Sequence, residues 1–181
     1  MAFSDQSALF QTESLLTWQL MDQMADNDAA LHALDKTVSF VVYCATNQSL
    51  AAGINTKVQL DTEEYDSDGY FDSATNYRFT PLVAGLYQFA ARVRVDLIED
   101  ARSLKITLIK NGGSTSDRVS EWLGTIINPT DTIAVSLCCL AQANGTTDYF
   151  ELFAQQDGTT ANLILGGAAE SYFAGALVAQ R

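Results

Sequence analysis

Residues 70–89, YFDSATNYRFTPLVAGLYQF, carry the pattern that decides the fold. The stretch continues as AARVRVD, so that apolar and polar residues alternate along it. Tyr87 and Phe89, two residues apart, project from one face of an extended strand, whereas Arg92 projects from the other. Gly85 permits the turn that leads into this strand. The pattern predicts a β-strand with one buried face and one hydrated face.

Similar runs, rich in β-branched and aromatic residues, recur along most of the chain. Pieces rich in turn-forming residues separate them, and no helical pattern intervenes. Many short strands at such intervals predict an all-β antiparallel sandwich or jelly roll. The expected strands are 37–46, 86–97, 103–110, 132–143, 147–156, 162–165 and 171–179.

Some of these strands are apolar on both faces. Within 37–46, Phe40 and Val42 lie on one face of the strand. Val41 and Tyr43 lie on the other. A two-layer sandwich buries only one face of each strand, so the second face needs another cover. We expect a subunit interface to supply it; the alternative is that the N-terminal helices cover it within one chain.

Residues 1–36 have a different period. Leu20 and Met24, four residues apart, belong to an apolar stripe at helical spacing. The polar residues 26–28 interrupt the stripe and predict a turn between two short helices. We therefore expect a short N-terminal helical arm at 1–36, followed by the β domain at 37–181.

Composition narrows the classes of partner. The 181 residues include 10 basic and 22 acidic ones, for a net charge of −12. This charge opposes the counterion release that drives nucleic-acid binding, so nucleic acid is excluded as a partner. No apolar run approaches the roughly 20 residues that span a membrane. The N-terminal segment lacks the features of a signal peptide, which predicts synthesis in a cytoplasm without secretion.

The sequence offers little for catalysis. His32 is the only histidine, which argues against a Ser-His-Asp triad and a histidine-rich metal site. The cysteines, Cys44, Cys138 and Cys139, are odd in number and lie in apolar runs, so we interpret them as reduced core or interface residues. We expect no enzyme and no cofactor.

Acidic residues gather in one loop, and Asp66, Asp68 and Asp72 are the only candidates for metal ligands. Oxygen-rich loops bind hard cations such as calcium. The spacing nevertheless lacks the other ligand positions of a calcium-binding EF-hand loop. We interpret the loop as a solvated turn and predict no metal, with calcium as the alternative.

Two separated motifs resemble complement C1q-like domains of the C1q and tumour necrosis factor type. The first is 70–89, with Phe79, Pro81 and the closing Gly-Leu-Tyr-Gln-Phe. The second is Asp-Tyr-Phe-Glu-Leu at 148–152, followed by Ser-Tyr-Phe-Ala-Gly at 171–175. The resemblance implies a jelly roll that assembles as a homotrimer. The chain has no collagen-like stalk, and in this it is similar to C1q-like domains of bacteriophage virion proteins.

We therefore expect a capsid decoration, or cement, protein on the outer surface of a phage virion, where it stabilises the head by binding the major capsid protein or another virion protein. The alternative is a receptor- or carbohydrate-binding head at a tail fibre or needle tip, where Trp122, Tyr149 and Tyr172 would stack on a glycan. The expected anchor residues are Phe3, Leu9, Phe10, Leu15, Leu16 and Trp18. The residues expected in the trimer interface or the core are Phe40, Val42, Tyr87, Phe89, Tyr149, Tyr172 and Phe173.

Overall fold

The computed structural model describes residues 18, 20–28, 37–96, 103–112, 118–125 and 132–181. The chain divides into two units, Met1–Lys36 and Thr37–Arg181, and each is described by itself.

In the first unit, Trp18 and residues 20–28 are helical. The turn expected at Asp26, Asn27 and Asp28 is wrong, because all three residues are helical. Asp and Asn cost at most about 0.7 kcal/mol each in a helix interior, which is too little to end a helix without a second breaker. No helix among the described residues is long and apolar enough to cross a membrane.

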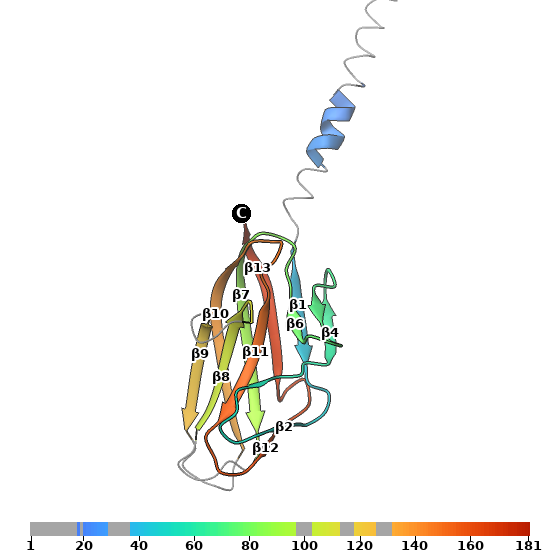
Figure 1. Ribbon diagram of the computed structural model, residues 1–181. Helices are drawn as coiled ribbons and strands as arrows, with labels where there is room; N and C mark the ends of the chain where they lie inside the picture. The colour runs from blue at the N-terminus through green and yellow to red at the C-terminus, as the bar shows by residue number, and fades with distance from the viewer. Residues whose placement is uncertain (1–17, 19, 29–36, 97–102, 113–117, 126–131) are drawn as a thin grey trace, which may run out of the picture. The chain divides into compact units, whose positions relative to one another are not determined.

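The second unit is a sandwich of two antiparallel sheets (Figure 1). We call the sheet that contains the strand at 85–95 sheet I and its partner sheet II. Sheet I has the order β2 (Gln48–Leu50), β12 (Asn162–Ile164), β7 (Gly85–Val95), β13 (Tyr172–Gln180), β1 (Ser39–Tyr43) and β4 (Thr62–Asp66), with β10 (Ile133–Ala143) also paired with β7. Sheet II has the order β5 (Phe71–Asp72), β6 (Arg78–Phe79), β11 (Phe150–Gln156), β8 (Ser103–Lys110) and β9 (Arg118–Thr125), with β3 (Thr56–Lys57) paired with β11.

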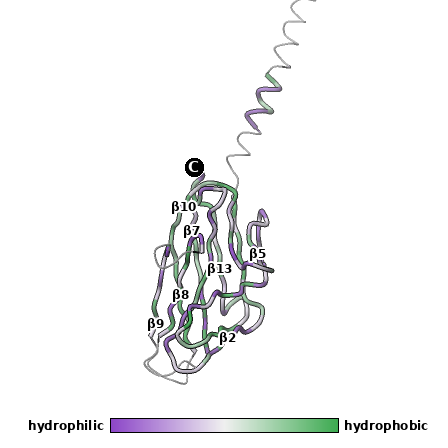
Figure 2. Tube along the Cα trace, in the orientation of Figure 1, coloured by the Kyte–Doolittle hydropathy of each residue, from purple (hydrophilic) through white to green (hydrophobic). Residues whose placement is uncertain are grey.

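The expected all-β antiparallel sandwich with a short N-terminal helix is confirmed. Each of the seven expected strands overlaps an observed one, and the strand at 103–110 has the expected bounds. None of the short strands β2 to β6 was expected, nor was β9, which is the longest of the strands missed. In Figure 2, hydrophobic positions recur along the central strands of the sandwich.

The core lies between the sheets and is largely aromatic. Phe40, Phe89 and Phe173 are at most 1% exposed and project from β1, β7 and β13. The Phe40 ring stacks on Phe79 from sheet II at 4.2 Å, and the Phe89 ring lies 4.6 Å from Phe150. Burying each such side chain contributes roughly 1.5–3 kcal/mol. Tyr87 and Val42 are also fully buried in this core.

Candidate functional site

An apolar row crosses the outer face of sheet I, the face that points away from the core. Val41 on β1 lies opposite Tyr65 on β4 and opposite Ala174 on β13. Ala174 lies opposite Ala90 on β7, which in turn lies opposite Cys138 on β10. Five adjacent strands therefore place uncharged, mostly small side chains side by side on a surface that the described residues of the β unit do not cover.

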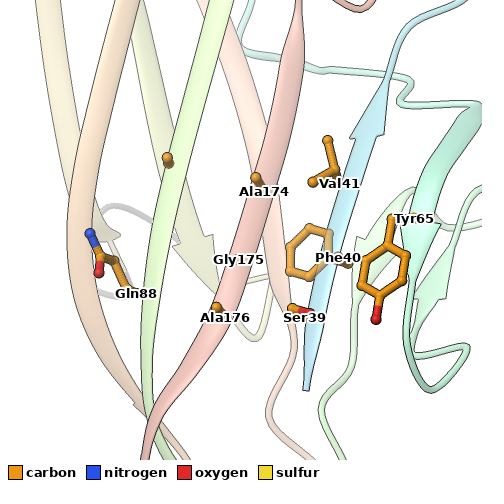
Figure 3. Close-up of a pocket in the computed structure, with 9 residues that line it drawn as sticks. Ser39, Phe40, Val41, Tyr65, Gln88, Ala174, Gly175 and Ala176 are labelled. Atoms are coloured by element: carbon orange, nitrogen blue, oxygen red, sulfur yellow. The ribbon is translucent and has the colours of Figure 1, made fainter. Parts of the chain in front are cut away.

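The small side chains of this row leave a groove of about 310 Å³. Figure 3 shows Ala174 and Ala176 along β13 and the Tyr65 ring standing beside β1. Tyr65 is 54% exposed, so it forms a wall that other side chains do not cover. The lining contains no charged residue: Ser39, Phe40, Val41, Tyr65, Gln88, Ala90, Ala174, Gly175 and Ala176.

A second row on the same face is polar and aromatic. Tyr43 on β1 lies opposite Tyr172 on β13, and Tyr172 lies opposite Arg92 on β7. Tyr172 is half-buried on this outer face and does not belong to the core. The hydrated face expected for β7 holds for the exposed Gln88, whereas Arg92 and Arg94 are half-buried. The Arg94 guanidinium pairs with the Glu170 carboxylate at 2.8 Å.

At one edge of the sandwich, β9 is the outermost strand of sheet II and β10 is an outer strand of sheet I. The strand β9 pairs only with β8, and β10 pairs only with β7. A Cβ at Gly124 on β9 would lie 2.9 Å from Val135 on β10, so the two edge strands touch. Three large apolar side chains at this edge are exposed: Trp122 at 60%, Leu123 at 57% and Leu140 at 56%.

Two cationic side chains of sheet II, Lys110 on β8 and Arg78 on β6, each contact a partner within the β unit. The Lys110 ammonium lies 2.8 Å from the Asp148 carboxylate, and Asn111 donates a hydrogen bond to the same carboxylate. Burial raises the pKa of Asp148, but hydrogen bonds from Lys110, Asn111 and a backbone amide outweigh burial and lower it. The Arg78 guanidinium lies over the Tyr149 ring, 4.4 Å from its centroid. Tyr149 is half-buried in this contact and lies outside the core.

The candidate metal ligands form turns. The Asp66 carboxylate accepts hydrogen bonds from the backbone amides of Gly69 and Phe71 at 3.1 and 2.7 Å. The Asp72 carboxylate accepts from the amides of Thr75 and Asn76, and hydrogen bonds from these residues hold the pKa of Asp72 below its usual range. Ser67 donates a hydrogen bond to Asp68. Among the described residues, no group of three or more carboxylate, thiol and imidazole side chains could hold a metal ion.

The three thiols are free. Burial, with a contribution from the nearby Asp61 carboxylate, raises the pKa of Cys44 to about 12. Burial and the neighbouring Cys138 raise the pKa of Cys139 to about 11. A thiol with such a pKa carries almost no thiolate near neutral pH and is a poor nucleophile. Cys138 is exposed on the outer face of sheet I.

The helix of the first unit exposes apolar side chains. Trp18 is 68% exposed and Met24 is 69% exposed, and Leu20 and Met21 are each 57% exposed. The other expected anchor residues, and the single histidine, lie outside the described residues: Phe3, Leu9, Phe10, Leu15, Leu16 and His32.

Comparison with known proteins identifies the fold. No family model matches the chain. No curated protein matches it in sequence either. Among solved structures, the globular domain of zebrafish complement 1qA protein is 16% identical, with a TM-score of 0.55 over 80% of this chain and 99% of that one. Murine APRIL is 8% identical, with a TM-score of 0.60 over 79% and 100% of the two chains. Eiger TNF from S. frugiperda is 8% identical, with a TM-score of 0.57 over 80% and 93%. The β unit therefore has the jelly-roll fold of C1q and tumour necrosis factor domains.

Proposed function

We propose that this protein is a non-enzymatic, homotrimeric decoration protein of a phage capsid, in which the β unit forms the trimer and the N-terminal unit attaches it to the head. The apolar outer face of sheet I carries this proposal. Its uncharged row spans five strands and contains a groove, and a surface of this kind is typical of a protein interface.

The protomer offers two unlike apolar surfaces, and this favours a closed ring. The groove lies on the face of sheet I from β4 to β7, whereas the exposed Trp122 and Leu140 lie at the edge formed by β9 and β10. When one copy places its edge on the face of the next, the contact is heterologous, and a ring forms if the rotation closes. Three copies is the number that the C1q resemblance implies.

Burial of the exposed apolar side chains would offset much of the cost of association. A large apolar side chain such as Trp122 contributes roughly 1.5–3 kcal/mol when it is removed from water. Each of three contacts would bury Trp122 and Leu140 of one copy, whereas Leu123 projects from the other face of β9. This sum is comparable to the association cost of about 4–15 kcal/mol per binding event, which neighbouring small residues help to offset.

The chemistry of the described residues supports a role without catalysis. Asp148 pairs with Lys110, and Asp66 and Asp72 hold turns. The pKa values of Cys44 and Cys139 are raised, which keeps these thiols protonated. Binding surfaces are therefore better supported than reactive groups.

The exposed helix of the first unit supports attachment to a larger partner. Trp18, Leu20 and Met24 would each gain from burial at a partner surface, and a trimer presents three such helices at once. We expect the major capsid protein to be this partner.

Co-sedimentation with phage heads tests the attachment. The variant carries Trp18→Ser, Leu20→Ser and Met24→Ser in the full chain, and Asp22→Asn on the same helix is the control. We expect the triple variant to remain a trimer and to stay in the supernatant, while the control sediments with the heads. Equal binding by the triple variant would contradict the anchoring role.

A receptor-binding head is the second candidate, because sheet II carries a separate pocket. Gly69, Tyr70, Asp72, Arg78 and Leu82 contribute to a pocket of about 260 Å³, which combines aromatic, charged and apolar groups. A glycan array separates the two functions. Dose-dependent signals that Arg78→Ala abolishes would favour receptor binding over decoration.

A further inference from the structure

Arg92 is a half-buried cation that has no partner among the described residues of the β unit. The Arg92 Nε atom is buried and has no hydrogen-bond partner, and no ion pair joins Arg92 to a described residue. Arg94, two residues further along the same face, has what Arg92 lacks: an ion pair with Glu170 and hydrogen bonds to Thr132. A buried donor without an acceptor costs about 1–3 kcal/mol, and a charged one costs more.

One carboxylate in the described part of the β unit also lacks a partner. Among the described side-chain carboxylates from Thr37 onward, only Glu64 accepts no hydrogen bond and forms no ion pair. Its neighbour Glu63 accepts a hydrogen bond from Ser73 at 2.6 Å. Glu64 lies at an irregularity of β4, where Tyr65 pairs with Val41 but Glu63 pairs with the next residue of β1. Such a bulge turns the extra side chain away from the regular ladder.

The two groups do not meet within one protomer. Glu64 lies on β4, at one edge of sheet I, whereas Arg92 lies on β7, beside the opposite edge strand β10. The strands β1 and β13 lie between them, which separates the backbones by roughly 14 Å. No hydrogen bond or ion pair joins the two side chains.

We propose that Arg92 of one copy pairs with Glu64 of the adjacent copy in the trimer. This inference rests on the proposed self-association, to which it adds the charge pair that sets the register of the interface. Glu64 is next to Tyr65, the wall of the groove. A contact that brings the β10 side of one copy to the β4 side of the next joins Arg92 to Glu64 and repeats around the ring. The planar guanidinium matches a carboxylate with two parallel hydrogen bonds, which specifies orientation as well as attraction.

A double-mutant cycle on the full chain tests the pair by sedimentation equilibrium. The variants are Glu64→Gln, Arg92→Gln and the two combined. A second set contains the single reversals Glu64→Arg and Arg92→Glu and the charge exchange that combines them. We expect each single change to raise the concentration of half-assembly about tenfold or more, and the double change to have no greater effect than either. The charge exchange should assemble more tightly than either of its single reversals. Glu63→Gln, which changes a carboxylate already paired within the chain, should leave assembly unchanged.

Two results would overturn the inference, and they are distinguishable. If the wild-type chain assembles but the effects of Glu64→Gln and Arg92→Gln add, the two side chains are independent and only the pairing is wrong. If the wild-type chain does not self-associate, the proposed function fails together with the pairing. Melting of Arg92→Gln at a concentration below assembly serves as the folding control, and the variant should melt no lower than the wild type, because it removes a buried charged donor that has no partner among the described residues.

Discussion

Replacing Gly175 with alanine tests how closely the sandwich core is packed behind the groove. A Cβ at this position of β13 would lie 2.6 Å from the Phe40 Cε1 atom and 2.7 Å from the Phe89 Cδ1 atom. Ordinary contacts of a Cβ begin at about 3.4 Å, so both rings would have to move by most of an ångström. Phe40 is wedged between Phe79 at 4.2 Å and Phe173 at 5.0 Å, which blocks that movement.

Two effects of opposite sign decide the outcome. Alanine restricts the unfolded chain more than glycine does, and this stabilises a protein by about 0.4–1 kcal/mol where the native site accepts a Cβ. Overpacking of a core costs about 1–3 kcal/mol. Because the nearest atoms belong to confined rings, we expect overpacking to dominate and Gly175→Ala to lower the free energy of unfolding by about 1–2 kcal/mol net.

Urea unfolding followed by circular dichroism at one fixed protein concentration measures this change. Fixing the concentration matters because self-association contributes to apparent stability. Ala179→Ser, at an exposed position of the same strand, is the control. A second variant, Gly175→Ala with Phe40→Leu, should cost less than the two single changes together, because the smaller side chain makes room for the Cβ. A Gly175→Ala protein as stable as the wild type would refute this account of the packing.

Three further predictions concern other parts of the β unit. The pKa of Asp148 is lowered, so its ionised form adds stability above its ordinary pKa of about 3.9, and this stability is lost as the pH falls through the lowered pKa. In urea titrations, Asp148→Asn should therefore be less stable than the wild type near pH 7, and the difference should shrink below about pH 4; a constant difference would contradict the assignment. Iodoacetamide near pH 8 should leave the buried Cys44 intact in the folded protein, and labelling of Cys138 should fall as the protein concentration rises, because the proposed trimer covers it. Gly145→Ala should destabilise the fold by about 1–3 kcal/mol in thermal melts, since its Cβ would lie 2.5 Å from the Ala84 amide nitrogen and its φ is +71°; unchanged melting would show that this turn can shift.

Alternating patterns were sufficient to predict the central strands. Tyr87 and Phe89 are buried on one face of β7, as the period of two predicts. The strand β9 escaped prediction, since its sequence RVSEWLGT places polar residues among apolar ones and belongs to an edge that leaves Trp122 exposed. An edge strand buries little of either face, so its sequence carries little periodicity.

The candidate interface was only partly predictable. The apolar second face of β1, with Val41, indicated that a cover is needed, and the outer face of sheet I has that character. The alanines that line the groove give a misleading signal, because alanine is among the residues most often buried in a core. Arg92 was interpreted as a hydrated residue. Its lack of a partner depends on which side chains surround it in the fold, and no pattern in the sequence reports this.

Sedimentation equilibrium of the full chain beside its Ala174→Glu variant tests the central claim most directly. Ala174 lines the groove and lies in the middle of the apolar row. We predict that the wild type sediments as a trimer at micromolar concentration, and that a carboxylate buried three times in the interface leaves the variant monomeric and folded. A wild type that stays monomeric at all concentrations, or a variant that assembles as tightly as the wild type, would contradict assembly through the outer face of sheet I.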